Sequence, residues 1–238
     1  MMALKYKKVA FEISRKIANG KYTDKLPSEA ELVKKYNTSR NTIRNAMDAL
    51  FEQGLIKRVQ GSGYFVNVPL HSDGYFMNIA GKNGLGRLGK TTSIDSKVLE
   101  LKVQPAGEEI ARHLDCESDD QVYYVSRLRL SGADLVSLEH AYYLKQQVPY
   151  LTKEICENSI FNFIVENYDI EITNADEYVS AYSLGKEEAK ESGKPAGTPT
   201  LHVEEINCVK NEHPFNYSNS YYFPEGMTIY MHINNSIS

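Results

Sequence analysis

The sequence predicts an α+β protein with two domains, an N-terminal winged helix-turn-helix and a C-terminal domain built on an antiparallel sheet. Signals for helix starts crowd the first fifty residues, a glycine-containing hairpin signal follows, and the later residues form long β-rich runs joined by polar turns. The chain has 238 residues, more than one winged helix needs. We therefore place the first domain at 1–68, a linker rich in Pro, Ser, Asp and Gly at 69–74, and the second domain at 75–238.

Two helices are predicted before residue 37. The first carries apolar residues at helical spacing and ends at Asn19-Gly20; these residues are Tyr6, Val9, Ala10, Ile13 and Ile17. The second starts just after Pro27, because Ser28 and Glu31 form an S-x-x-E capping box, and it runs over 28–36.

A third helix is predicted over 39–53, capped by Ser39 and stopped by Gly54. One stripe of this helix is apolar and follows the i, i+3, i+4, i+7 rule: Ile43, Ala46, Met47 and Leu50. The opposite face presents Arg40, Asn41, Arg44 and Asn45. Arg and Asn are the residue types that make bidentate contacts to guanine and adenine edges in a major groove, so this face is typical of a DNA-recognition helix.

A hairpin follows the third helix. Residues 55–58 and 64–68 are predicted strands, and Gln60-Gly61-Ser62-Gly63 forms the tip between them. Gly61 and Gly63 allow a tight turn and a close approach to a phosphate backbone. This hairpin is the predicted wing.

These elements resemble the N-terminal domain of the GntR family of bacterial transcription regulators over about residues 4–68. The motifs are Pro27-Ser28-Glu29, then Ser39-Arg40-x-Thr42-x-Arg44, then Gly61-x-Gly63-Tyr64-Phe65-Val66. Many members carry Arg directly after Pro-Ser-Glu, where this chain has Ala30. The resemblance implies that the DNA-binding residues are Ser28, Glu29, Ser39, Arg40, Thr42, Arg44, Gln60, Gly61 and Gly63.

The charge is divided unevenly along the chain. Residues 1–68 hold 13 Lys+Arg against 6 Asp+Glu, a formal charge of +7, and the remainder holds 14 against 25, a formal charge of −11. A basic first domain supplies the attraction to phosphates that DNA binding needs, whereas an acidic second domain is repelled by DNA. The second domain therefore has another task.

Cysteine usage and hydropathy exclude several classes of protein. The three cysteines, Cys116, Cys156 and Cys208, are far apart and include no C-x-x-C pair, so we expect no metal, no redox site and no cofactor. No apolar run reaches the roughly 18 residues of a membrane span, and no signal peptide precedes Tyr6. The sequence predicts a cytoplasmic protein without a membrane partner.

A glycine-rich segment at 81–93 includes Gly89-Lys90-Thr91, and Gly84 completes the spacing of a phosphate-binding P-loop. A P-loop should open an amphipathic helix, yet the run that follows, 98–103, is strand-like. We expect a loop at 81–90 that orders on a small ligand rather than a nucleotide site.

The rest of the second domain alternates strands with single helices. Residues 122–130 and 135–144 form a hairpin through 131–134, and 160–168 has helical spacing. Further strands are predicted at 172–184, 200–209 and 215–223, with a turn at 210–214. Hairpin-linked strands give an antiparallel sheet with helices packed against it.

The second domain resembles the UTRA effector domain of the HutC subgroup of GntR regulators, over about residues 75–235. The motifs are Arg127-Leu128-Arg129, Leu138-Glu139, Ser159-Ile160-Phe161, Pro214-Phe215-Asn216-Tyr217 and Tyr222. The resemblance implies a chorismate lyase-like fold that binds a ligand. It also implies an effector site made of Thr92, Arg127, Arg129, Glu139, Ser159, Phe161, Asn216 and Tyr222. The chain departs from related sugar-phosphate sensors at Phe161, where they have Tyr, and at Asn216, where they have Glu.

The residues themselves support an anion site. Alternation along a strand places Arg127 and Arg129 on one face, and two guanidinium groups match the geometry of a phosphate. The alternatives are that these arginines lie on a solvated strand face or that they form salt bridges to Glu139 and a neighbour. Ser159 either caps a helix or adds anion-binding N–H donors at its N-terminus. His140 points to the opposite face from Glu139, so the two cannot share a ligand.

Together these features predict a ligand-responsive transcription regulator that acts as a homodimer on a palindromic double-stranded operator. We expect a repressor that a phosphorylated sugar or similar anionic metabolite releases from DNA. Three alternatives are a regulator that senses a non-sugar ligand, an enzyme built on the chorismate lyase-like domain, and a structural DNA-binding protein without an effector. No Ser-His or Cys-His constellation stands out to support the enzyme.

Overall fold

The computed structural model describes residues 2–18, 20–67, 76–78, 94–168, 170, 172–223 and 227–230. The chain divides into two compact units, one made of 1–91 with 226–238 and the other of 92–225. The predicted domain boundaries at 68 and 75 lie outside the described residues, as do the linker at 69–74, the glycine segment at 81–93 and Thr92. Within the described residues, no helix is long and apolar enough to cross a membrane.

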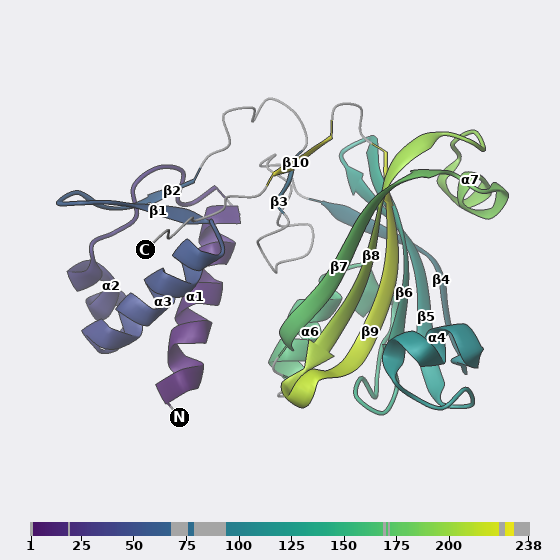
Figure 1. Ribbon diagram of the computed structural model, residues 1–238, viewed down its shortest axis with the longest axis horizontal. Helices are drawn as coiled ribbons and strands as arrows, with labels where there is room; N and C mark the ends of the chain where they lie inside the picture. The colour runs from purple at the N-terminus through teal and green to yellow at the C-terminus, as the bar shows by residue number, and fades with distance from the viewer. Residues whose placement is uncertain are drawn as a thin grey trace, which may run out of the picture. The chain divides into compact units, whose positions relative to one another are not determined.

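The first unit contains the winged helix-turn-helix (Figure 1). Its helices are α1 (Met2–Ala18), α2 (Glu29–Tyr36) and α3 (Arg40–Glu52), and its wing strands are β1 (Ile56–Val59) and β2 (Gly63–Val66). The wing strands pair antiparallel, with Ile56 opposite Val66 and Val59 opposite Gly63. This order and these bounds confirm the predicted fold of the first domain to within a few residues.

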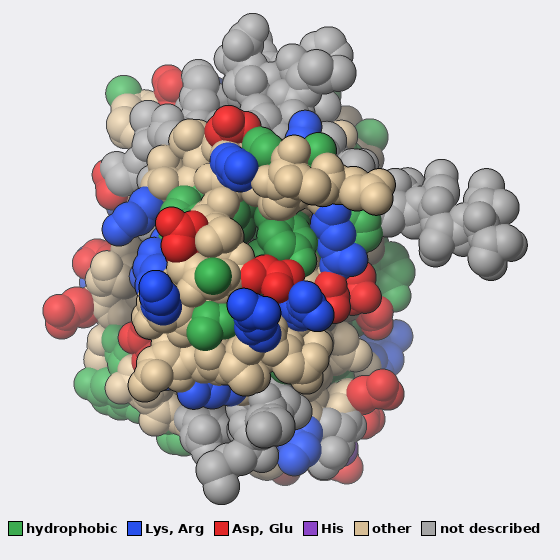
Figure 2. Space-filling model, turned by 90° about the vertical axis from the view of Figure 1, so that its left-hand side faces the viewer, with side chains coloured by type: hydrophobic (Ala, Val, Ile, Leu, Met, Phe, Trp, Pro, Cys, Tyr) green, Lys and Arg blue, Asp and Glu red, His purple; other side chains and the backbone are tan. Residues whose placement is uncertain are grey.

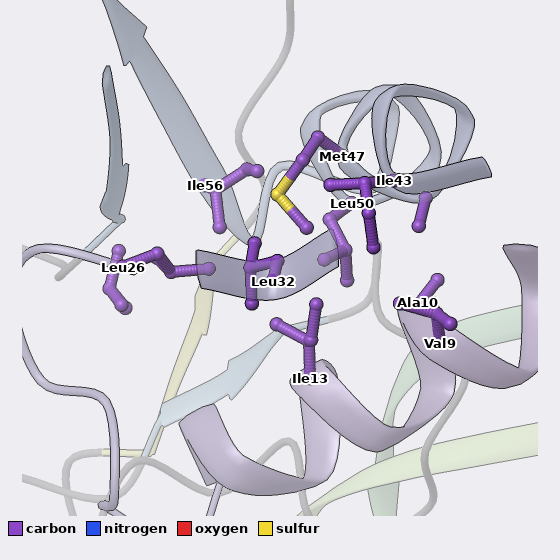
Figure 3. Packing of buried hydrophobic residues seen from close by; sticks show 11 residues of the cluster. Val9, Ala10, Ile13, Leu26, Leu32, Ile43, Met47, Leu50 and Ile56 are labelled. Atoms are coloured by element: carbon purple, nitrogen blue, oxygen red, sulfur yellow. The ribbon is translucent and has the colours of Figure 1, made fainter. Parts of the chain in front are cut away.

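The three helices meet in one apolar core (Figure 3). It is built from the stripe of α3, one face of α1, Leu32 of α2 and the first residue of the wing. Its buried members are Val9, Ala10, Ile13, Leu26, Leu32, Ile43, Ala46, Met47, Leu50, Ile56 and Val66. Because this stripe faces inward, the polar face of α3 is left to solvent.

Capping residues set the starts of α2 and α3. The Ser28 hydroxyl accepts a hydrogen bond from the Glu31 backbone N–H at 3.3 Å, and the Glu31 carboxylate accepts from the Ser28 backbone N–H at 2.8 Å. Ser39 accepts from the Thr42 backbone N–H at 3.2 Å. The predicted capping box and the predicted second cap are both confirmed.

A short parallel pair, β3 (Phe76–Asn78) with β10 (Thr228–Tyr230), also belongs to the first unit. Thr228 pairs with Phe76 and Tyr230 with Asn78. This pairing was not predicted, because strands of three residues are too short to show a pattern. It joins a segment that follows the wing to one near the end of the chain.

The second unit is a six-stranded antiparallel sheet in the order β4-β5-β6-β9-β8-β7 (Figure 1). The strands are β4 (Asp95–Pro105), β5 (Gln121–Ser131), β6 (Asp134–Leu144), β7 (Ile172–Ser183), β8 (Pro199–Val209) and β9 (His213–Tyr222). The helices are α4 (Gly107–Leu114), α5 (Lys153–Cys156), α6 (Ile160–Asn167) and α7 (Lys186–Ser192), with a 3₁₀ turn η2 (Lys210–Glu212).

Helices cover both faces of this sheet. On one face, Tyr123, Val125 and Tyr143 pack with residues of α5 and α6 such as Cys156 and Ile160. The other face packs against α4 through Val122, Leu144 and Tyr217, and α7 lies on it near β6, where its Glu191 reaches His140. We call the first face the α6 face and the second the α4 face.

The predicted hairpin at 122–144, the helix at 160–168 and the later strands are confirmed, as is the strand after the glycine segment. The strand β9 begins at His213, earlier than predicted, because the connection at 210–212 is a compact 3₁₀ turn. The helices α4 and α7 were not predicted individually. Each has at most eight residues, too few to show an apolar period clearly.

Candidate functional site

The solvent face of α3 carries the predicted recognition residues. Arg40, Asn41, Arg44 and Asn45 are all exposed, whereas the apolar stripe behind them is fully buried. Thr42 is held at the start of this helix, because its backbone N–H and its hydroxyl both contact the Ser39 hydroxyl, at 3.2 and 2.9 Å. The structure therefore places Ser39 and Thr42 at the end of α3 that also bears Arg40.

Glu29, at the start of α2, contacts a residue of α3 and a residue of the wing. Its carboxylate accepts from Arg44 Nε at 3.2 Å and from the Tyr64 hydroxyl at 3.2 Å. The Arg44 side chain stays 62% exposed, so the guanidinium is held in place but open to a partner. Burial and the neighbouring Glu29 raise the pKa of Tyr64. Glu29 thus positions Arg44. The resemblance placed Glu29 among the DNA-binding residues and did not predict this contact.

The wing tip is built from exposed residues in unusual backbone conformations. Gly61 has φ +74° and Gly63 φ +106°, values that side chains with a Cβ rarely adopt. Gln60, Gly61 and Gly63 are exposed, and no atom lies within 4 Å of a Cβ built on Gly61. Leu26 donates its backbone N–H to the Tyr64 carbonyl at 3.0 Å, which ties the wing to the segment before α2.

Basic side chains are spread over this side of the molecule (Figure 2). Lys and Arg lie among neutral groups, with acidic side chains between some of them. Asp48 of α3 forms an ion pair with Arg58 of the wing strand β1. Such a surface has groups for phosphate contacts, and the exposed part of α3 offers groups for base contacts.

In the second unit, Arg127 and Glu139 form a bidentate ion pair on the α6 face. Arg127 donates from Nε and Nη2 to the two carboxylate oxygens, each at 2.9 Å, and the two residues lie directly opposite in β5 and β6. Arg127 Nη1 also donates to the carbonyls of Cys156, at 2.9 Å, and Asn158, at 3.4 Å. Burial opposes both charges, but the pairing raises the pKa of Arg127 and lowers that of Glu139. Arg127 therefore forms the salt bridge to Glu139 that was one of the alternatives to an anion site.

Arg129 lies two residues further along the same face but in a different environment. Its Nη1 donates to the Ser96 hydroxyl at 2.8 Å, and its buried Nε has no hydrogen-bond partner among the described residues. Burial and the charge of Arg127 lower the pKa of Arg129 to about 10. A guanidinium in this state lacks a full counter-charge, and its site would gain from an anion.

Small polar side chains surround the two arginines. Ser137 lies opposite both Arg129 and Tyr222, and Ser220 lies opposite Glu139. Tyr222 is close enough to influence the pKa of Arg129. The sequence analysis missed Ser96, Ser137 and Ser220, and only the strand register identifies them. Cross-strand neighbours on one face form a single surface, so these hydroxyls border the site of Arg129.

Ser159 and Phe161 belong to the start of α6. The exposed Ser159 caps the helix, since its hydroxyl accepts from the Asn162 backbone N–H at 3.4 Å. Arg127 contacts the carbonyl of the preceding residue, Asn158, so the ion pair and the helix start are neighbours. Phe161 packs on Phe215 with ring centroids 6.0 Å apart and belongs to the apolar layer under α6.

Asn216, which the resemblance assigns to the effector site, lies apart from Glu139 along the sheet. It lies opposite Tyr143, four residues along β6 from Glu139, a distance of about 14 Å in an extended strand. Its side chain is buried and bonded, accepting from Asn207 at 3.0 Å and donating to the Tyr142 carbonyl at 3.0 Å. It stabilises the sheet interior instead.

His140 lies on the α4 face, as strand alternation predicts. Its Nε2 lies 2.7 Å from the carboxylate of Glu191 in α7, which also accepts from the buried Ser126 hydroxyl at 2.9 Å. These contacts hold α7 on the sheet. Within the described residues, no group of three or more His, Cys, Asp or Glu side chains is arranged to hold a metal ion.

Comparison with known proteins agrees with both halves of this description. Residues 5–66 match the family described as bacterial regulatory proteins, gntR family, and residues 90–227 match the UTRA domain. The chain is similar to two regulators of Bacillus subtilis. It is 34% identical to the uncharacterized HTH-type transcriptional regulator YydK, covering 90% of this chain and 91% of that protein, and 31% identical to GmuR, covering 90% and 92%.

A third relative has a name that states its role. The mannosyl-D-glycerate transport/metabolism system repressor MngR of Escherichia coli is 31% identical over 68% of this chain and 67% of its own length. Among solved structures, the crystal structure of YydK superposes with a TM-score of 0.71 at 32% identity, covering 97% of this chain and 99% of that one. The similarity therefore extends over both units.

Proposed function

The chain belongs to the gntR family of bacterial transcription regulators and carries a UTRA domain, and from this premise we propose that it is a repressor released from DNA by a small anionic metabolite. It is a transcription regulator rather than an enzyme, as its relatives are. The alternative of an enzyme built on the second domain is set aside. Repression, the class of ligand and the homodimer are the proposed parts.

The environment of Arg129 carries the proposal of an anionic ligand. The carboxylate of Glu139 neutralises Arg127 through two hydrogen bonds of 2.9 Å, whereas among the described residues Arg129 hydrogen-bonds to the neutral hydroxyl of Ser96. One positive charge on the α6 face is thus left without a full counter-ion. A phosphate accepts several hydrogen bonds from a guanidinium and from hydroxyls such as those of Ser137, Ser220 and Tyr222.

Sugar phosphates are the proposed class of effector. Hydroxyl-rich ligands match the serine hydroxyls that border Arg129, and a phosphate matches the guanidinium. The name of MngR ties that relative to the transport and metabolism of mannosyl-D-glycerate, itself an anionic sugar derivative. In this proposal Arg127 acts through Glu139 and Asn158, positioning them and the start of α6, while Arg129 meets the anion. Thr92 and Ser159 remain proposed contacts.

DNA binding uses the exposed face of α3 and the wing. Arg40 and Arg44 are proposed to contact bases, and Ser28, Gln60 and the wing glycines are proposed to approach phosphates. A homodimer on a palindromic operator doubles these contacts and matches the two-fold symmetry of the site. This part of the proposal rests on the exposed side chains and on the bonds that hold Arg44 at Glu29.

Calorimetry of the full-length chain with a panel of sugar phosphates and the matching neutral sugars tests the effector class. We expect heat of binding only from the phosphorylated members, and a thermal stabilisation of about 2.7 kcal/mol at 100 times the Kd. Arg129→Met should lose the binding, while the exposed control Arg112→Met should keep it. Binding of neutral sugars alone, or full affinity in Arg129→Met, would contradict the anion site.

DNA retention and reporter assays test the regulatory part. The chain should retain a palindromic DNA fragment from beside its own gene and release it when the effector is added. Linkage requires the effector to bind the DNA complex more weakly by the same factor. Reporter expression that falls when the gene is deleted would contradict the repressor.

A further inference from the structure

The strand β7 forms one edge of the six-stranded sheet. It runs over Ile172–Ser183 and pairs along its length with β8; among the described residues, no strand pairs with its other side. Its side chains alternate between exposed and half-buried, and Tyr178, at the middle of the strand, is 57% exposed. A long edge like this presents a row of backbone N–H and C=O groups that another strand can pair with.

The opposite edge of the sheet is protected in the ways that edge strands commonly are. The strand β4 has a register shift between Val98 and Glu100, carries Lys97 and Lys102, and ends at Pro105. Bulges, lysines and prolines each discourage pairing with another chain. The strand β7 has no Lys, Arg, Pro or Gly, and its register shift lies only at its first residues. The two edges therefore differ in their capacity to accept a partner.

We propose that β7 pairs antiparallel with β7 of a second copy of this chain, joining the two sheets into one of twelve strands. This inference rests on the homodimer of the proposed function and assigns its contact surface. A second copy is the occupant that the edge itself favours, because a two-fold axis perpendicular to the sheet makes a strand antiparallel to its own copy. That axis also keeps the α6 faces of both copies, and so both Arg129 sites, on the same side.

The side chains of β7 favour one register. Directly opposite residues must point to the same face, so the axis passes through a residue position rather than between two. An axis at Glu177 would set two carboxylates against each other, which is unfavourable. An axis at Tyr178 sets Tyr178 against the partner's Tyr178, an aromatic cross-strand pair.

The same register places compatible side chains along the rest of the strand. Glu177 then lies opposite the partner's Val179, and Ala175 lies opposite the partner's Ala181. The two tyrosines can cover the junction on the α4 face, on which Tyr178 lies. In this register the side chains of β7 are complementary to those of a second β7.

Cysteine cross-linking of the full-length chain tests this register. In a Cys116→Ser background, Tyr178→Cys should form a disulfide-linked dimer under mild oxidation, because directly opposite Cβ atoms lie about 4.5–5.5 Å apart. Val179→Cys should not cross-link to itself but should cross-link in a mixture with Glu177→Cys. Val103→Cys, 43% exposed on the opposite edge, is the matched control and should stay unlinked.

A measurement of dimer affinity completes the test. Tyr178→Lys should raise the dimer Kd by at least about tenfold, since it replaces the aromatic pair with two like charges at the axis. Val103→Lys should change it by no more than about twofold. Circular dichroism of both variants verifies that the sheet is folded.

The outcomes separate this inference from the homodimer itself. A wild-type chain that sediments as a monomer at micromolar concentration overturns both. A wild-type dimer whose Kd is unchanged in Tyr178→Lys, with no cross-link through Tyr178→Cys, leaves the homodimer standing and overturns the β7 interface. A dimer that cross-links through Val103→Cys instead moves the interface to β4.

Discussion

Replacing Arg129 by Met is expected to stabilise the second domain of the ligand-free protein. Burial and the charge of Arg127 lower the pKa of Arg129 to about 10, well below its ordinary value. That difference corresponds to at most about 3 kcal/mol against the charged form. The pKa of Arg129 is depressed in the folded state, so this unfavourable contribution is fully present at neutral pH and disappears only as the pH rises above about 10 toward the ordinary pKa of arginine.

Two effects reduce the gain. Arg129 is partly exposed, so water screens some of the unfavourable contribution, and Met loses the hydrogen bond to Ser96, worth roughly 1 kcal/mol. Met keeps most of the apolar stem, so its packing changes little. The expected net gain is about 1–2 kcal/mol, or a rise in Tm of several °C for a domain of this size.

Scanning calorimetry of the full-length chain is the appropriate assay, because the winged-helix transition serves as an internal reference. Arg112→Met, on the exposed side of α4, should leave both transitions in place. Arg127→Met should instead destabilise the second domain by roughly 3–5 kcal/mol, since it leaves Glu139 buried without its partner. If Arg129→Met lowers the Tm as Arg127→Met does, Arg129 already has a counter-charge and the argument for an anion site fails.

Four further predictions concern the remaining sites. Arg44→Ala should lose roughly 1–3 kcal/mol of specific DNA binding in a binding titration. If Glu29 acts by holding Arg44, a double-mutant cycle with Glu29→Ala should show strong coupling between the two changes. Additive losses of binding free energy would refute that role. Gly61→Val should weaken DNA binding while calorimetry finds the fold intact, because φ +74° strains a β-branched residue; unchanged binding would exclude the wing tip. Ser28→Ala should lower winged-helix stability by about 1 kcal/mol in thermal unfolding, and no loss would mean that the capping box is dispensable. The pKa of Glu139 is lowered in the folded state, so Glu139→Gln should be less stable than wild type above pH 4.5. The difference in unfolding free energy between the two proteins should shrink as the pH falls below that value. A difference that stays constant in acid unfolding would exclude the ion pair as its cause.

The winged helix was predictable because its determinants are local. The capping box of Ser28 with Glu31 and the i, i+3, i+4, i+7 stripe of α3 lie within a few residues, so the sequence alone defines their geometry. The bonds from Glu29 to Arg44 and Tyr64 were not predictable, because they span 15 and 35 residues. No periodicity reports which side chains meet across such separations.

In the effector site, too, some features were predictable from the sequence and others were not, but for a different reason. Alternation predicts that Arg127 and Arg129 share a face, and the register confirms it. The partner of Arg127 depends on a bulge. Counted from the turn pair of Ser131 with Asp134, a regular hairpin would set Arg127 against Leu138; the shift between Arg129 and Leu130 moves it to Glu139. The register of Asn216 opposite Tyr143 was not predictable for a related reason, since a short motif gives its position in the chain but not its partner on β6.

Screening of charge in salt solution limits how the proposed anionic effector can release DNA. The Debye length is about 8 Å at physiological ionic strength, so the charge of an anion bound at Arg129 acts directly only over short distances. The release must therefore come from a change in the arrangement of the two winged helices, whose recognition helices have to match half-sites roughly 34 Å apart. If the β7 strands join both sheets into one, that junction is a rigid base. The change then has to pass through the chain segments that connect the two units. Cross-linking the dimer through Tyr178→Cys should accordingly leave effector-induced release intact, because this junction joins only the two sheets and leaves the connecting segments unlinked.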